Sequence, residues 1–315
     1  MKRIFGLVLL LCSVGCRPAE EKQIPPMSEP ATSKVAKTDV TSPSAVRTPQ
    51  ELPQTPETLP ENEDEDVDWK RYIEDDEYLS KPLEYGPLLG EDATKMTRLD
   101  PKKPVWVYKE KKLVVTQGWV CQVRVPLEFL ICQGTGYRRK VPYKEEGMPD
   151  TVLQFNGPKS HESIFCIDVP ASVLHAGLLA IGAKTGEPVR FQPKLEPPTG
   201  DPITITIRWK NPAGEIVERN ARELIIDHDT GKPMEKDWVF AGSFFYEDDD
   251  GVQRYAADSE GEVVGVSNFP SVMLDVPQVS SSSNESLLYV SNEKELPERG
   301  TPVTILFSIA EQGKE

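Results

Sequence analysis

The chain has 315 residues and a formal net charge of −15 at pH 7. This acidic balance argues against a nucleic-acid-binding protein, because such proteins need a basic face to meet the phosphates. It favours a self-repelling, soluble surface and says little about the fold.

The first residues have the form of a targeting segment. Lys2 and Arg3 give it a positive start, and the apolar run 4–12 that follows is too short to span a bilayer as a helix. Small residues then lead to Cys16, and this arrangement resembles a bacterial lipoprotein signal, in which the cysteine is lipidated. An ordinary secretory signal cut nearby is the alternative. Either form of signal peptide at 1–16 predicts export to the cell envelope or periplasm, and lipidation would add a membrane anchor.

Residues 17–104 contain little that could form a core. Their first part consists mainly of Pro, Glu, Ser, Thr and Lys and ends in an acidic run. Such a composition cannot offset the entropy of ordering, so we expect a disordered, acidic, Pro-rich tether. Trp69, Tyr72 and Ile73 are spaced as in a short amphipathic helix, which makes the segment 67–100 a candidate for docking on the domain.

The globular domain is expected at 105–315. Residues 113–122 and 127–132 have the composition of two strands and predict a β-hairpin. Residues 133–159 are rich in Gly, Lys and Glu and predict a loop, and 163–169 predicts an apolar strand.

One short helix follows, at about 170–181. Asp168 is placed to cap it, Pro170 lies in its first turn and Gly182 stands just past its end. Its apolar residues recur at helical spacing, so one face should be buried. These residues are Val173, Leu174, Gly177, Leu178 and Ile181.

Strands dominate after the helix. Residues 203–209 alternate between apolar and polar side chains, as a half-buried strand does. A turn and a returning strand at 215–218 follow, and 238–246, 263–266 and 303–309 read as further strands. The whole pattern predicts a single α+β domain that is mainly β, with antiparallel or mixed sheets and one short central helix.

Three cysteines lie in the domain: Cys121, Cys132 and Cys166. In an oxidising compartment at most one pair of them can form a disulfide, which leaves one thiol over. Because Cys132 and Cys166 fall on two predicted strands, a disulfide between them is one expectation.

The stretch 156–183 is the main candidate for a site. His161 and Glu162 precede a strand, and His175 lies at the edge of the helix stripe. Together with Cys132 these residues offer the N, O and S ligands of a zinc-type site, so a bound divalent metal is one hypothesis. Neither HExxH nor CxxC is present, and we therefore expect no cofactor. The structural alternative is that His175 is a boundary histidine bonded to a neighbouring strand.

A cysteine–histidine nucleophilic pair is the other catalytic alternative. Cys132 is the better nucleophile candidate, with His161 or His175 as its base. Cys166 lies among apolar residues in the middle of a strand, where a thiol is inert packing.

Several short stretches occur in an order that is typical of one family. They are 120–121, 126–128, Cys132, 159–163, 174–182, 186–189, 238–243 and 300–303. Taken together they resemble the YdjY-type domain, which occurs in exported bacterial proteins, notably of planctomycetes. The resemblance runs from about Leu113 to Ile309 and implies no particular reaction.

These observations favour a binding or interaction module over an enzyme. We expect it to be exported, attached to a membrane through Cys16, and held on a disordered stalk. Its partner would be a protein or a small molecule rather than nucleic acid. The alternative is a metal- or thiol-dependent enzyme that uses His161, Glu162, His175 and Cys132.

Overall fold

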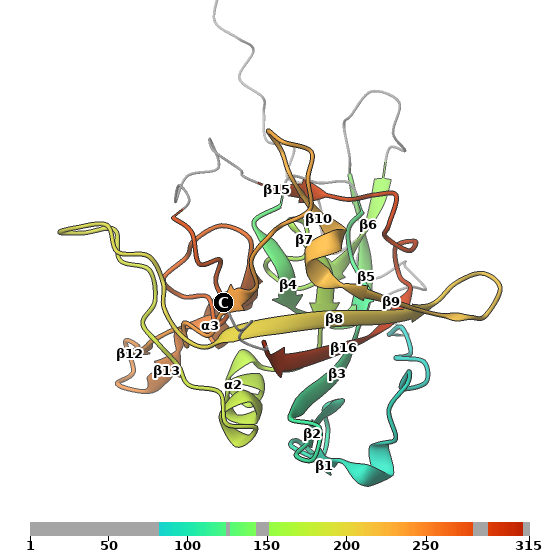
Figure 1. The fold of residues 1–315 in the computed structure, drawn as a ribbon, viewed down its shortest axis with the longest axis horizontal. Helices are drawn as coiled ribbons and strands as arrows, with labels where there is room; N and C mark the ends of the chain where they lie inside the picture. Colours follow the sequence, from blue (N-terminus) through green and yellow to red (C-terminus); the bar gives the residue numbers. More distant parts are fainter. Residues whose placement is uncertain (1–81, 124–126, 143–150, 280–288, 311–315) are drawn as a thin grey trace, which may run out of the picture. The chain divides into compact units, whose positions relative to one another are not determined.

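The computed structural model describes residues 82–123, 127–142, 151–279 and 289–310 (Figure 1). The predicted signal peptide, Cys16 and most of the predicted tether lie outside these ranges. Among the described residues, no helix is long and apolar enough to cross a membrane.

A ten-stranded sheet forms the centre of the domain. Its main path runs in the order β11-β8-β16-β3-β7-β4-β14, with β2 also paired to β3, β1 to β2, and β9 to β8. All of these pairs are antiparallel except β4 with β7. Its strands are β1 (Thr97–Arg98), β2 (Val105–Tyr108), β3 (Leu113–Val120), β4 (Phe129–Gln133), β7 (Ser163–Ile167), β8 (Pro202–Lys210), β9 (Ile216–Asn220), β11 (Trp238–Val239), β14 (Glu262–Gly265) and β16 (Pro302–Ile309).

Short hairpins and helices surround this sheet. The two-stranded pairs are β5 (Thr135–Pro142) with β6 (Thr151–Asn156), β10 (Ile225–Asp227) with β15 (Tyr289–Ser291), and β12 (Phe245–Glu247) with β13 (Gln253–Tyr255). The α-helices are α2 (Ala171–Ala180) and α3 (Ala256–Glu260), and the 3₁₀ turns are η1 (Ala93–Lys95) and η2 (Ala221–Leu224). The predicted fold class is confirmed: the domain is mainly β and its central sheet is mixed. In the described residues, α2 is the one helix longer than α3.

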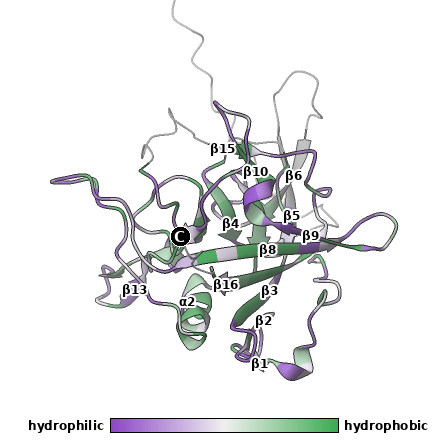
Figure 2. Cartoon of the chain, viewed as in Figure 1, coloured by the Kyte–Doolittle hydropathy of each residue, from purple (hydrophilic) through white to green (hydrophobic). Residues whose placement is uncertain are grey.

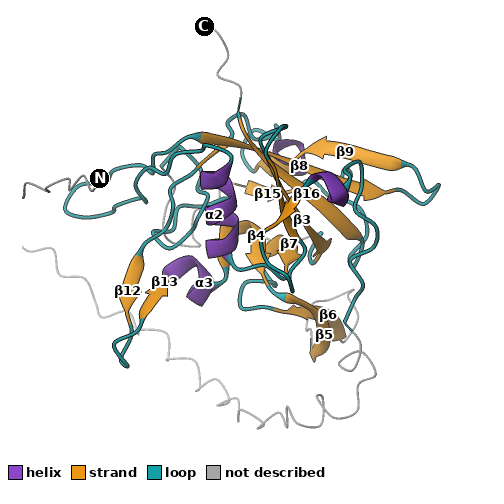
Figure 3. Cartoon of the chain, turned by 90° about the horizontal axis from the view of Figure 1, so that it is seen from below, coloured by secondary structure: helices purple, strands orange, loops and turns teal. Residues whose placement is uncertain are grey.

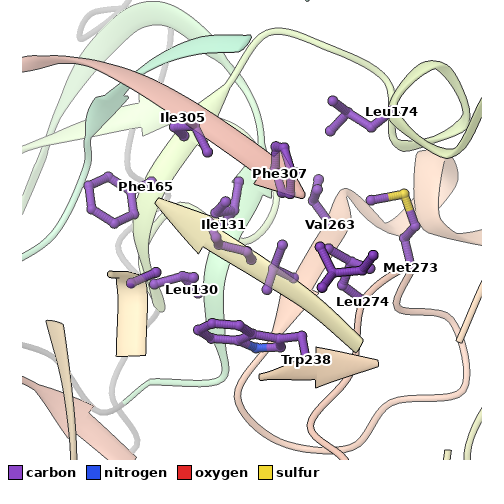
Figure 4. Packing of buried hydrophobic residues seen from close by; sticks show 14 of the residues in the cluster. Leu130, Ile131, Phe165, Leu174, Trp238, Val263, Met273, Leu274, Ile305 and Phe307 are labelled. Carbon is purple, nitrogen blue, oxygen red and sulfur yellow. The ribbon is translucent and has the colours of Figure 1, made fainter. Parts of the chain in front are cut away.

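The alternation along β8 shows how the sheet separates its two faces. Ile203, Ile205, Ile207 and Trp209 are buried in the main core, as predicted, and the side chains between them belong to the opposite face. Figure 4 shows Ile305 and Phe307 of β16, Phe165 of β7 and Trp238 of β11 in this core. Figure 2 shows the hydrophobic residues concentrated in the central strands and in α2.

The predicted hairpin of 113–122 with 127–132 is wrong. β3 and β4 are not hydrogen-bonded to each other, because β7 lies between them, antiparallel to β3 and parallel to β4. The predicted loop 133–159 is also wrong over much of its length, since it contains the β5–β6 hairpin.

The helix prediction is confirmed in position and corrected in its cap. Gly182 has φ +96 just past the helix end, as expected. Pro170 is the N-cap and makes no side-chain capping bond. Asp168 instead accepts hydrogen bonds from Lys103 Nζ at 2.6 Å and from Tyr85 Oη at 3.3 Å, so its carboxylate is held by neighbours distant in sequence.

A segment before the predicted domain boundary packs on the face of the sheet opposite the main core. Residues 82–91, here called the strap, cross β3, β16 and β8. Leu89 N donates to Thr304 Oγ1 at 3.0 Å, Gln117 Nε2 donates to Gly86 O at 3.1 Å, and Arg208 Nη1 donates to Leu89 O at 3.2 Å. Thr304 pairs in register with both Gln117 and Arg208, so one polar row across three strands binds the strap.

Candidate functional site

His161 and Glu162 lie in a charged cluster at the β4, β7 and β14 side of the sheet. His161 Nε2 is 3.7 Å from Glu162 Oε2, and Lys159 Nζ is 3.4 Å from Glu162 Oε1. Lys159 Nζ is also 3.6 Å from Glu262 Oε1, which β14 supplies. Glu128, just before β4, joins them because its backbone N–H donates to Glu162 O at 3.2 Å. We call these five residues the carboxylate cluster.

Burial and mutual repulsion shape the protonation of this cluster. Burial raises the pKa of Glu128, and the charge of Glu162 and a hydrogen bond to it raise it further. Burial also raises the pKa of Glu262. For Lys159 burial opposes the charged form, but the charges of Glu162 and Glu262 outweigh it and raise the pKa. Glu128 therefore keeps its proton to higher pH than an ordinary glutamate, next to the Lys159 ammonium group.

His175 lies in a different environment. Its Nδ1 is 2.9 Å from Tyr255 Oη, and the Tyr255 hydroxyl donates to Gly242 O at 2.8 Å. Because that hydroxyl has one proton, His175 Nδ1–H is the donor to Tyr255, which makes the other ring nitrogen unprotonated in the neutral ring. The ring also contacts Phe240 edge-on at 4.8 Å, and burial lowers the His175 pKa. His175 thus ties α2 to the segment after β11, as the boundary alternative expected.

Cys132 belongs to a third place, a cluster of three thiols. Cys132 and Cys166 are direct partners across β4 and β7, and Cys121 follows the end of β3. All three are buried and free, together with Trp119 and Phe155. The expected Cys132–Cys166 pair is therefore aligned, while both residues carry thiols.

The three thiols differ in pKa. Burial opposes the thiolate of Cys132, but the side chains of Cys121, Cys166 and Ser163 outweigh it and hold the pKa of Cys132 below its usual range. Burial, followed by the Cys132 side chain, raises the pKa of Cys121, and the Cys132 side chain, followed by burial, raises that of Cys166. The Cys121 thiol donates its one proton to Ser163 O at 2.9 Å.

The four residues predicted to share a site are therefore divided. The structure keeps His161 with Glu162 and gives His175 and Cys132 other neighbours. In the described parts of the chain, no group of three or more His, Cys, Asp or Glu residues is arranged to hold a metal ion. The sequence analysis missed Glu128 and Glu262, which pairing between strands brings to this cluster, and Lys159, which lies only three residues before Glu162.

An exposed apolar surface is the other feature that the sequence analysis missed. Residues 238–246 were predicted to form one strand, and this is wrong after Val239. Gly242 and Ser243 have φ +86 and +55, a left-handed conformation that ends an extended strand. The chain turns out of the sheet, and Phe245, at the start of the β12–β13 hairpin, is 67% exposed.

Buried Tyr255 links the hairpin to α2. The ring of Phe245 lies 5.1 Å from that of Tyr255, which contacts His175 of α2 at 5.6 Å. Figure 3 shows the hairpin beside α3 and α2. Apart from His175, α2 carries no ionisable side chain, and Leu179 on it is exposed. We call the following residues the hairpin surface: Leu179, Phe244, Phe245, Tyr246 and Val252, all exposed.

Comparisons with known proteins bear on the family to which this domain belongs. No curated protein and no solved structure matches the chain. A family model, the YdjY domain, matches residues 139–308, from β5 to the end of β16. The matched residues include Glu162, His175, Cys166 and the hairpin surface, whereas Cys121, Glu128 and Cys132 precede them. Since the match covers more than half of the chain, this protein belongs to the YdjY domain family.

Proposed function

We propose that this protein is an exported, tethered binding module whose hairpin surface docks a partner protein. The partner would have an apolar pocket edged by basic residues. The observation that carries the proposal is the exposure of three consecutive aromatic residues, Phe244, Phe245 and Tyr246, on a hairpin that projects beside α2.

The energetics of apolar exposure support docking. Burying one large apolar side chain contributes about 1.5–3 kcal/mol. Contiguous exposed apolar residues on a soluble protein commonly mark an interaction site, and aromatic residues dominate the binding energy of such sites. The exposed aromatic residues of the hairpin are neighbours, since the rings of Phe244 and Tyr246 lie 6.5 Å apart and Phe245 stands between them in the chain. Ile216 of β9, by contrast, is a single exposed apolar residue, at 52%.

The negative charge of the hairpin indicates that the partner has basic residues around its pocket. The hairpin turn carries four successive carboxylates, 247–250, of which Asp248 is paired with Arg254 at 2.7 Å. The net charge of −15 is of the same sign. A basic rim on the partner would therefore be attracted to the hairpin and would accelerate association at low salt.

The sequence of residues 1–16 supports the location of this module. The apolar run before Cys16 would direct export, and a lipid on Cys16 would attach the domain to a membrane through the Pro-rich tether. Mass spectrometry of the mature N-terminus tests this part: a lipidated Cys16 is expected, and an unmodified terminus elsewhere would contradict it.

Comparative affinity capture from the native cell envelope tests the docking surface. The bait proteins are the unaltered chain, Phe245→Ser and the control Ile216→Ser. A partner with basic residues at its contact site should be retained by the chain and by Ile216→Ser, and lost with Phe245→Ser. Equal recovery by all three baits would contradict the proposal, and so would recovery of a second copy of this chain.

A second candidate function is acid–base chemistry at the carboxylate cluster. The specific observation is the Glu128 carboxyl, whose pKa is raised by burial and by the neighbouring Glu162, close to Lys159 and the exposed His161. The enzyme alternative therefore remains a candidate for His161 and Glu162. It no longer includes His175 or Cys132, which have other neighbours. Metal analysis of the purified protein and of His161→Ala tests whether a divalent ion takes part. Metal-free protein in both cases would contradict the metal form of this candidate.

A further inference from the structure

One cavity of the domain is used neither by the proposed docking nor by the acid–base chemistry. It lies beside the turn of the β8–β9 hairpin, which Figure 1 shows extending from the sheet, and its volume is about 660 Å³. Ligand sites of proteins commonly have a volume of this order. We call it the β8–β9 cavity.

Apolar side chains form one part of its lining. Trp209 of β8 is only 5% exposed, and Val217 of β9 is its direct partner, so the two side chains lie on the same face of the hairpin. Leu296, from the segment between β15 and β16, also lines the cavity and packs against the main core. An aromatic or aliphatic side chain that entered the cavity would contact these three residues.

Two cations of the lining are free. Lys210 and Lys294 are exposed, and neither makes an ion pair or a side-chain hydrogen bond with any part of the chain that the structure describes. Arg219 lies 3.0 Å from Glu295, which neutralises that pair, and Glu298 is the remaining carboxylate of the lining. In a chain with a net charge of −15, this cavity therefore carries three cationic against two anionic side chains. Its two free lysines favour an anionic occupant.

The chain itself contains a segment of matching chemistry. Residues 74–77 are four successive carboxylates, and Tyr78 and Leu79 follow them directly. An acidic run beside an aromatic and an aliphatic side chain is the complement of two free lysines beside an apolar lining. The hairpin surface offers no such match, because its own carboxylates at 247–250 repel those of 74–77.

The strap begins close to the cavity and brings this segment within reach. Leu83 N donates to Gly136 O at 2.9 Å, and a Cβ on Gly300 would lie 3.8 Å from Leu83 Cδ1. Gly300 directly precedes Thr301, which lines the cavity. Four residues span at most about 14 Å, so the chain between Leu79 and Leu83 is long enough to reach the cavity.

We propose that residues 74–79 dock in the β8–β9 cavity of the same chain. Tyr78 and Leu79 contact its apolar side chains, and the carboxylates of 74–77 lie beside Lys210 and Lys294. Docking prolongs the contact that the strap makes with the sheet, and it fixes the point at which the predicted tether leaves the domain.

Photo-crosslinking within the chain tests this contact. The protein is the full chain with Cys16→Ser, which prevents lipidation, and a photoreactive phenylalanine analogue replaces Tyr78. Unlabelled and isotope-labelled chains are mixed before irradiation, so that mass spectrometry distinguishes peptides joined within one chain from peptides joined between two. We expect crosslinks within one chain to the segments 209–219 and 294–301.

Charge reversal tests the two lysines. Lys210→Glu combined with Lys294→Glu should lower the yield of these crosslinks by roughly 2- to 10-fold, the change that the loss of two exposed ion pairs produces. Asp75→Lys combined with Asp76→Lys should lower it similarly. All four substitutions together should restore the yield, because the charges are then exchanged rather than removed.

Lys184→Glu combined with Lys236→Glu is the matched control, since both lysines are exposed and neither lines this cavity. Its crosslink yield should equal that of the unaltered chain, and circular dichroism verifies that each variant is folded. Three outcomes would overturn the proposal: no crosslink to 209–219 or 294–301, crosslinks mainly between two chains, or equal yields from the cavity variant and the control.

Discussion

Arg208→Met should loosen the strap, because the Arg208 guanidinium makes two of the hydrogen bonds that hold the strap to the sheet. Arg208 Nη1 donates to Leu89 O and to Glu91 Oε1, each at 3.2 Å, and the Glu91 side chain is only 4% exposed. Methionine retains the apolar stem and removes the charge. Lys111 Nζ, 2.8 Å from Glu91 Oε2, would be the remaining partner of the Glu91 carboxylate.

The cost follows from these contacts. Leaving one partner of a buried ion pair without the other costs about 3–5 kcal/mol, and a hydrogen bond to a charged group contributes about 1.5–3 kcal/mol. Because Lys111 still neutralises Glu91, the full cost of an unpaired buried charge does not apply. We expect a loss of about 2–3 kcal/mol in the free energy of unfolding, within the range for hydrogen bonds to a charged group. Urea unfolding measures this loss. Hydrogen exchange at Leu89 N–H, which donates to Thr304 Oγ1, reports the strap locally.

The loss should depend on pH. Burial opposes ionisation of Glu91, but the hydrogen bonds and charges of Lys111 and Arg208 outweigh it and lower its pKa. The pair therefore stabilises the fold above the ordinary pKa of a glutamate, and this contribution disappears as pH falls through the lowered pKa. The difference between Arg208→Met and the unaltered chain should be full at neutral pH and should shrink in acid.

The exposed pair Arg190–Glu196 supplies the control. Arg190 is 63% exposed, and exposed ion pairs contribute about 0–1 kcal/mol. If Arg208→Met were as stable as Arg190→Met, with unchanged exchange at Leu89, the reasoning about the strap would be refuted.

Three further predictions concern the candidate sites. Glu128→Gln should stabilise the fold at neutral pH and flatten the pH profile of unfolding, because the raised pKa of Glu128 makes its ionised form destabilising above the ordinary glutamate range; an unchanged profile would contradict the raised pKa of Glu128. Phe245→Ser should change thermal stability little, whereas Phe240→Ala, at a buried position, should lose about 3–5 kcal/mol; equal losses would place Phe245 in the core. His175→Gln should reduce the loss of stability in mild acid, because the lowered pKa of His175 makes its protonation destabilising below the ordinary histidine range; calorimetry at pH 7 and pH 5 should show a smaller difference than in the unaltered chain.

Local patterns predicted the elements whose environment is set by their own residues. The alternation along 203–209 identified β8 and its buried face, and helical spacing identified α2. Both patterns record burial on one side of an element, which is a local property. A disulfide between Cys132 and Cys166 was expected because both lie on predicted strands; the two residues are partners across β4 and β7, but both carry free thiols.

The failures arise where strands pair with distant partners. β7 enters between β3 and β4, so a hairpin inferred from their proximity in sequence was wrong. The same insertion places Cys166 beside Cys132, and β14 brings Glu262 to Lys159. No spacing along the chain records these contacts.

The exposed hairpin shows a different limit. Residues 238–246 have the composition of a core strand, and the turn depends on the backbone at Gly242 and Ser243. Ser243 Oγ donates to Ser271 O at 2.6 Å, a contact with a remote segment that holds the turn. Composition alone could not distinguish a buried strand from an exposed aromatic hairpin.

Site-specific photo-crosslinking in living cells tests the central claim, docking through the hairpin surface, most directly. A photoreactive phenylalanine analogue replaces Phe245 in one strain and Ile216 in another. The account predicts a crosslink from position 245 to a protein whose crosslinked peptide contains apolar and basic residues, and none to that protein from position 216. The absence of a crosslink at 245, or the same products from both positions, would contradict the claim.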